Sequence, residues 1–176
     1  MYSLLSNASI SVVLVLVDFQ DLKMGAGAKQ RFQDLFFSTG KIPTGSVNEY
    51  YQEVSKGKIS LAGEVIGPFT LSHEMKYYAN GKYGRDWPEP NSVTMAEEAV
   101  TAATGKTNFN KYDNDGNGYV CKDRHLLFLA VGKLTVAQID VFCVVHAGTG
   151  GETSGNTDNI WSVKWTLNQE RKLNGQ

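Results

Sequence analysis

One segment of the chain carries oxygen-bearing side chains at alternate positions, and it reads Asp-Asn-Asp-Gly-Asn-Gly-Tyr from Asp113 onward. In a calcium loop of the EF-hand type, Asp113, Asp115 and Asn117 would supply side-chain oxygens. Tyr119 would supply its backbone carbonyl, and Gly118 permits the sharp turn that brings the ligands round one ion. The spacing therefore predicts a calcium site. The alternative is a solvated turn, because Asp, Asn and Gly favour turns without any ion.

The segment 120–138 interrupts this loop and has neither clear helical caps nor strand alternation. It puts Arg124 at the twelfth position, where an EF-hand loop carries a bidentate Glu, so the chain as written cannot close the site. Reverse translation of the segment is compatible with a fungal-type splice donor, branch point and acceptor, and we expect it to be a translated intron. Its removal would bring Asp140 to the ninth loop position and Cys143 to the twelfth, which is still an incomplete EF-hand.

The histidines of the chain do not form a zinc motif. A zinc peptidase holds its metal with two His one helical turn apart and places a Glu between them as general base, giving H-E-x-x-H. Here the His-Glu pair is His73-Glu74, and Tyr77 stands where the second His is required. His146 follows a predicted buried strand, where a hydrogen-bonded structural role is expected. His125 lies in the suspected intron and is assigned no role.

Hydrophobic patterning predicts strands that could position these groups. The run Ile10–Val17 is apolar and rich in β-branched residues, which favours a buried strand. Lys58–Phe69 alternates polar and apolar residues as a half-buried strand does, and Val141–Val145 is a second buried strand with Cys143 as a small core residue. Leu71–Pro90 and Ala147–Asp158 are expected to be irregular connections.

Helices are expected between these strands. Ser46 stands three residues before Glu49, as a capping box requires, and so predicts the start of a helix. That helix carries an expected buried stripe of Val47, Tyr51 and Val54. Further helices are predicted over Gln30–Phe37 and Ser92–Ala103. The mixture of elements indicates an α+β (α/β-type) fold with helices on a mixed, mostly buried sheet.

Composition excludes several classes of protein. The 176 residues carry 17 Lys+Arg against 18 Asp+Glu, a net charge of -1, so there is no basic excess for nucleic acid or anionic lipid. The apolar run Ile10–Val17 is too short for a membrane span, which needs about 20 residues. No Lys or Arg precedes Lys23, so this run also lacks the basic region of a signal peptide. We therefore expect no nucleic-acid partner and no membrane partner.

Four stretches of the chain resemble the immune inhibitor A-like zinc metallopeptidases in their fungal form. They are VLVLVDFQD at 13–21, LFFSTGKIPTGSVNEYYQEVSKGKISLAGEVIGPFTL at 35–71, NKYDNDGNGY at 110–119 and DVFCVVHAGTGGETSGNTDNIWSVKW at 140–165. The resemblance implies a secreted protein with a zincin-like fold, calcium beside a catalytic zinc, and protein or peptide substrates. The implied reaction is hydrolysis of peptide bonds by zinc-activated water.

In that family the H-E-x-x-H helix follows soon after the region that matches IWSVKWTL at 160–167. Residues 1–176 are therefore expected to be the N-terminal part of a catalytic domain, with an incomplete sheet. They would lack the zinc ligands and the catalytic base, so the chain as given is expected to be inactive. Two alternatives remain open at this point: a calcium-binding module that never carried zinc, and a regulatory or decayed pseudoenzyme.

Overall fold

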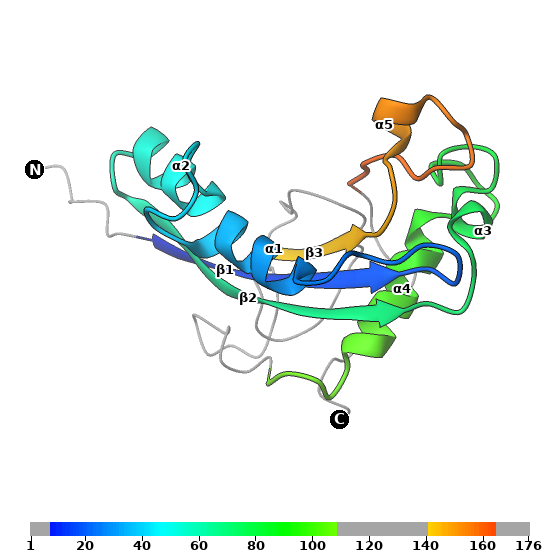
Figure 1. Ribbon diagram of the computed structural model, residues 1–176, viewed down its shortest axis with the longest axis horizontal. Coiled ribbons are helices and arrows are strands. Elements are labelled where there is room, and N and C mark those ends of the chain that lie inside the picture. Colours follow the sequence, from blue (N-terminus) through cyan, green and yellow to red (C-terminus); the bar gives the residue numbers. More distant parts are fainter. Residues whose placement is uncertain (1–7, 109–140, 165–176) are drawn as a thin grey trace, which may run out of the picture.

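The computed structural model describes residues 8–108 and 141–164, and Figure 1 shows the course of the chain. Its elements in chain order are β1 (Ala8–Asp18), α1 (Ala28–Phe37), α2 (Val47–Val54), β2 (Ile59–Thr70), α3 (Met75–Ala79), α4 (Ser92–Ala103), β3 (Val141–His146) and α5 (Gly151–Ser154). This combination of helices with a sheet confirms the α/β-type fold class. Within the described ranges, no helix has the length and apolar character needed to cross a membrane.

Strand β1 lies in the middle of a three-stranded sheet with the order β2-β1-β3, and both neighbours run parallel to it. At its centre, Leu14 pairs with Val65 of β2 and with Cys143 of β3. A parallel strand that is covered on both faces needs apolar residues at successive positions. This requirement explains the run from Val12 to Val17, in which every residue is buried. The three predicted strands are confirmed, with small shifts at their ends.

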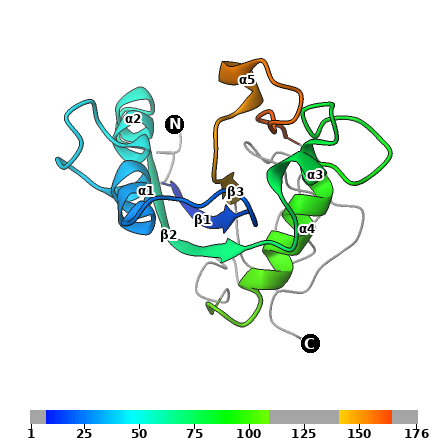
Figure 2. The ribbon, with the colours of Figure 1, turned by 45° about the vertical axis from the view of Figure 1, so that its right-hand side comes forward.

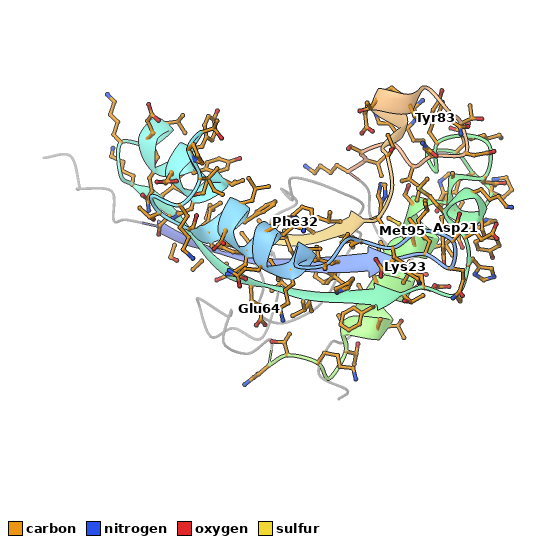
Figure 3. All side chains as sticks on the ribbon, in the orientation of Figure 1. Asp21, Lys23, Phe32, Glu64, Tyr83 and Met95 are labelled. Carbon is orange, nitrogen blue, oxygen red and sulfur yellow. The ribbon has the colours of Figure 1, made fainter. Side chains whose placement is uncertain are left out.

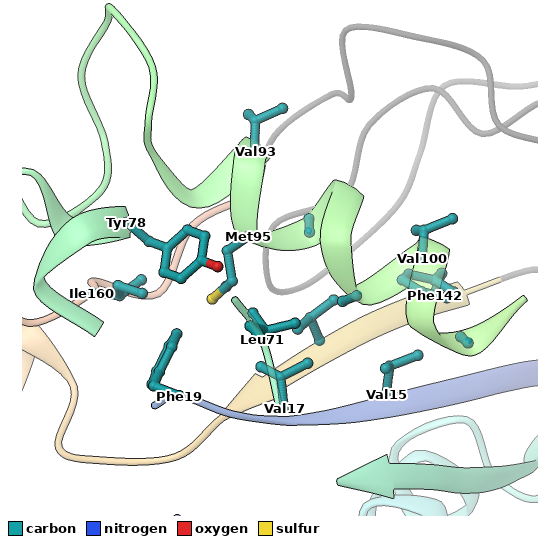
Figure 4. Close-up of a cluster of buried hydrophobic side chains, with 14 of the residues drawn as sticks. Val15, Val17, Phe19, Leu71, Tyr78, Val93, Met95, Val100, Phe142 and Ile160 are labelled. Atoms are coloured by element: carbon teal, nitrogen blue, oxygen red, sulfur yellow. The ribbon is translucent and has the colours of Figure 1, made fainter. Parts of the chain in front are cut away.

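The two faces of the sheet build two separate clusters, because successive residues of a strand point to opposite sides. The face toward α4 contains Val13, Val15 and Val17. Figure 4 shows this cluster, in which Phe19, Tyr78 and Met95 gather beyond the end of β1. The opposite face contains Val12, Leu14 and Leu16 and is covered by aromatic side chains of α1. Figure 2 shows α1 and α2 on one side of the sheet and α4 on the other.

The starts of two helices agree with the sequence. Ser46 Oγ accepts a hydrogen bond from the Glu49 N–H at 3.1 Å, and the Glu49 carboxylate accepts one from the Ser46 N–H at 2.8 Å. This is the predicted capping box, and it satisfies N–H groups that have no partner inside the helix. Helix α4 has the predicted bounds, and the side chain of Asn91 caps it by accepting from the N–H groups of Val93 and Thr94.

The predicted buried stripe of α2 is wrong at its end. Val54 is 57% exposed, and Val47 and Tyr51 are half-buried. The side chain that α2 buries is Asn48, whose Oδ1 accepts a hydrogen bond from the Leu61 N–H at 2.8 Å. The helix therefore packs a polar amide against the edge of β2, which an apolar repeat cannot indicate.

Both connections that were expected to be irregular contain a short helix. Helix α3 lies within the first and α5, a single turn, lies within the second. The first N–H of α3, at Met75, is satisfied by the carboxylate of Asp21 at 3.1 Å. Because these two residues are 54 positions apart in the chain, the local sequence carries no sign of this helix start.

The outer edge of β2 is closed by side chains of α1, of α2 and of Ser55, the residue that follows α2. The Gln33 amide accepts from the Val65 N–H at 3.0 Å and donates to the Gly63 carbonyl at 3.5 Å, as a neighbouring strand would. Asn48 accepts from Leu61 in the same way, and Ser55 Oγ accepts from the Ile59 N–H at 2.9 Å. An uncovered edge strand offers unpaired backbone groups to other chains, and these amides and hydroxyls remove that opportunity.

We expect the substitution Gln33→Leu to destabilise the chain by about 1–3 kcal/mol, because it leaves the Val65 N–H and the Gly63 carbonyl without partners. Urea unfolding would measure the loss, and light scattering would measure the increased self-association of the opened edge. Gln30→Leu is the matched control, since Gln30 lies on the same helix and its side chain donates to the half-buried carboxylate of Asp34 instead of to β2. Equal effects of the two substitutions would contradict this role of Gln33.

Candidate functional site

The residues predicted to bind calcium lie outside the described residues. This applies to Asp113, Asp115, Asn117, Tyr119 and Asp140. The suspected intron at 120–138 lies in the same undescribed range, together with His125. The calcium site and the intron therefore stay predictions.

The described polar side chains that could bind a ligand or take part in a reaction lie at the carboxyl edge of the sheet. The three parallel strands end at Asp18, Thr70 and His146, so their last residues meet at one edge. Open α/β sheets bind ligands at this edge, which makes it the candidate site of this chain. Figure 3 shows Asp21, Lys23 and Tyr83 at this end of the molecule.

The two aspartates at this edge hold the backbone of the following loops. Asp18 is 8% exposed, and its Oδ1 accepts a hydrogen bond from the Met24 N–H at 2.7 Å. Asp21 accepts from the first N–H of α3. Lys23 Nζ donates to the Phe19 carbonyl at 2.6 Å and to Thr70 Oγ1 at 3.1 Å, which ties the ends of β1 and β2 together. These groups shape the edge of the sheet.

A carboxylate of α4, Glu98, is the centre of a hydrogen-bond network at the same edge. It accepts from the hydroxyl groups of Ser72 and Tyr78, each at 2.6 Å, and from the Ser72 N–H at 3.2 Å. Burial acts to raise the pKa of Glu98, but the donated hydrogen bonds outweigh it and lower that pKa. Burial and the carboxylate raise the pKa of the Tyr78 hydroxyl. The network thus fixes α4 to the segment that follows β2.

Ser72, His73 and Glu98 have the residue types of a hydrolase triad but not its order. Ser72 Oγ lies 2.7 Å from His73 Nδ1 and donates its one proton to Glu98, so the serine stands between the other two. In a catalytic triad the histidine stands between the nucleophile and the acid. The ring of His73 also stacks on Tyr77 at 3.8 Å between centroids. The arrangement therefore positions a loop and does not activate a nucleophile.

The sequence pair His73-Glu74 is divided between different partners. Glu74 is the residue before α3, and its carboxylate pairs with Lys76 at 2.6 Å on the surface. His73 lies beside Ser72, and the residue at the position of a second zinc histidine is Tyr77. The pair therefore does not converge on one point.

His146 and Cys143 on β3 have structural surroundings. The His146 Nδ1–H donates to the Ala147 carbonyl at 2.8 Å, and the ring lies 5.9 Å from that of Phe19. Burial lowers the pKa of this histidine, because a charged ring would lose its hydration. Burial likewise raises the pKa of Cys143 to about 12, which makes it an unreactive core thiol. The hydrogen-bonded histidine and the core cysteine expected from the sequence are confirmed.

Within residues 8–108 and 141–164, no group of three or more His, Cys, Asp or Glu side chains could hold a metal ion. A catalytic zinc needs three protein ligands that converge on one point. The described residues therefore do not fit a zinc ion.

Sequence reasoning missed the Glu98 network and an aromatic cluster formed by Tyr83, Arg85 and Trp161. Tyr83 and Trp161 are joined by a backbone hydrogen bond of 3.0 Å, although 77 residues separate them in the chain. Contacts over such separations leave no local pattern. The only sequence feature that pointed to the aromatic cluster was the Tyr-rich composition of 77–83, and it did not indicate which residues the tyrosines contact.

The substitution Tyr78→Phe tests the Glu98 network. We expect a loss of about 1.5–3 kcal/mol, the range for a hydrogen bond to a charged group. The bond stabilises the fold while Glu98 is ionised, so the difference from wild type should shrink as the pH falls below 4.5 and through the lowered pKa of Glu98. Chemical unfolding at pH 7 and pH 3.5 would measure it. Tyr77→Phe is the control, and an equal loss in both variants would contradict the assignment.

Comparison with known proteins agrees with the resemblance described above. Residues 9–176 match the family described as immune inhibitor A peptidase M6, catalytic domain. The comparison with curated proteins found no match. Because the family match spans nearly the whole chain, the chain belongs to the immune inhibitor A peptidase M6 family.

Proposed function

We propose that this chain is part of a secreted zinc metallopeptidase that hydrolyses peptide bonds in proteins, and that the 176 residues alone are inactive. Membership of the peptidase M6 family supports the reaction class and the protein substrates. The proposed inactivity is based on one observation, the absence of H-E-x-x-H from the 176 residues. Secretion is inferred from the family resemblance.

The surroundings of the described histidines support the same proposal. The ring of His73 stacks on Tyr77 and its Nδ1 lies 2.7 Å from Ser72 Oγ, and His146 is half-buried beside Phe19. Neither is joined by further ligands within the described ranges. We infer that the zinc ligands lie outside the described residues.

We also propose that the chain binds calcium when residues 120–138 are absent. The ligands would be Asp113, Asp115, Asn117, the Tyr119 carbonyl and Asp140. Their oxygen-rich spacing supports a calcium loop. Strand β3 begins at Val141, so a loop without 120–138 would lead directly into the sheet through Asp140.

We expect the purified 176-residue chain, supplied with zinc, to hydrolyse unfolded casein no faster than zinc in buffer. The reason is that it lacks two His and a general base in one motif. Chelator-sensitive hydrolysis by this chain would overturn the proposal. Sequencing the transcript beside the genomic locus adds a second readout. An in-frame H-E-x-x-H after Gln176 would support the peptidase. A transcript that retains the codons for 120–138 and stops at Gln176 would favour a calcium module or pseudoenzyme.

Deletion of residues 120–138 should strengthen calcium binding by at least about tenfold, because it brings Asp140 into the loop. Terbium luminescence, with calcium as competitor, would compare the intact and the shortened chain. The control is Asp115→Asn in the shortened chain, which removes one charged ligand and should weaken binding. Equal affinities of the intact and the shortened chain would contradict the proposed loop.

A further inference from the structure

Arg85 lies in the exposed connection between α3 and α4, and its guanidinium covers a pair of aromatic rings. Its Cζ atom is 5.4 Å from the centroid of the Tyr83 ring and 4.9 Å from that of Trp161. The two rings are perpendicular to each other, with centroids 5.3 Å apart. Both Arg–ring distances lie within about 6 Å, where a cation is attracted to an aromatic face. The guanidinium is therefore held in a defined place on the surface.

The aromatic pair is itself fixed by the backbone around it. The Tyr83 N–H donates to the Thr157 carbonyl and the Trp161 N–H donates to the Tyr83 carbonyl, each at 3.0 Å. The Tyr83 hydroxyl donates to the Gly155 carbonyl at 3.0 Å. Gly151 lies so close that a Cβ there would come within 2.7 Å of the Tyr83 ring. Two chain segments thus meet on this one side chain.

Tyr83 also has a φ of 59°, in the left-handed region that bulky residues avoid. Such a conformation costs about 1–3 kcal/mol and persists only where the surroundings impose it. Residues in this state concentrate at ligand-binding and catalytic sites. The backbone hydrogen bonds and ring contacts of Tyr83 are the surroundings that impose this conformation, so the residue is held rigidly beneath Arg85.

The hydrogen-bonding groups of Arg85 are open to solvent. Within the described ranges its guanidinium has no hydrogen bond and no ion pair, and the ion pairs found there join other residues. The Glu152 carboxylate accepts from the Ser162 N–H. An arginine carries five N–H donors in a planar fork that matches a carboxylate with two parallel hydrogen bonds. Arg85 presents this fork already oriented, which reduces the entropy lost on binding.

We propose that Arg85, held on Tyr83 and Trp161, is a binding site for the carboxylate side chain of an Asp or Glu in a protein or peptide ligand. The connection 82–89 carries Lys82 and Arg85 against Asp86 and Glu89, so its net charge is balanced. That balance favours a singly charged carboxylate over a phosphate dianion, which binds where cations cluster. Trp87 in the same connection is 49% exposed and offers apolar contact to a peptide. The site is independent of zinc and of the proposed peptidase activity.

The test measures binding to the full 176-residue chain by fluorescence anisotropy. Two labelled peptides, with blocked termini and the sequences Ala-Glu-Ala-Glu-Ala and Ala-Gln-Ala-Gln-Ala, differ only in their carboxylates. We expect the Glu peptide to bind at least about tenfold more tightly than the Gln peptide. Arg85→Met should abolish this preference, and Arg85→Lys should retain part of it because the charge remains without the planar fork. Circular dichroism would verify that each variant is folded.

Lys82→Met is the matched control, since it removes one exposed positive charge from the same connection and should leave the preference unchanged. Equal affinity of the wild-type chain for the two peptides would overturn the proposal. So would an equal loss in the Lys82 and Arg85 variants, which would indicate a diffuse charge effect. Inorganic phosphate added at the peptide's concentration should not displace the Glu peptide, and displacement would replace the peptide assignment with a general anion site.

Discussion

The burial of β1 is the constraint on which the rest of the structure depends. This strand has a parallel neighbour on each side and is covered on both faces, so Val12 to Val17 are all withdrawn from water. No position within it can carry a charged group without a large desolvation cost. The polar residues therefore begin at Asp18, where the strand ends, and the side chains that could bind a ligand or react lie in the loops beyond it. In the described residues, Asp18, Asp21 and Lys23 all bind backbone groups.

In the described residues, the carboxyl edge of the sheet is consequently a framework of side chains that hold loops and helices in place. Glu98, Asp18 and Asp21 each hold a specific loop or helix in position through hydrogen bonds. Membership of the immune inhibitor A peptidase M6 family accounts for such a framework, since a peptidase needs rigid elements beneath its catalytic groups. The guanidinium N–H groups of Arg85 are the exception, because the guanidinium stacks on Trp161 and its donors face solvent.

Local patterns predicted the strands, the capping box at Ser46 and the full extent of α4, because neighbouring residues determine each of them. They failed on α2, where the buried residue is the amide Asn48 and the apolar Val54 is exposed. The candidate site was predictable only in part. His146 and Cys143 followed from the buried strand that carries them. The stacking of Arg85 on Trp161 joins parts of the chain that only the tertiary fold brings together.

The side-chain amides along β2 determine on which edge of the sheet a further strand can pair. Gln33 and Asn48 belong to the crossover that connects β1 to β2, so the segment that builds this strand pair also terminates it on the outer side. Among the described strands, β2 and β3 form the two edges of the sheet, and these side chains cover the edge of β2. The segment between β1 and β2 thus closes the sheet on the β2 side. Pairing with another strand is accordingly favoured at β3, whose outer edge has no such side-chain cover among the described residues.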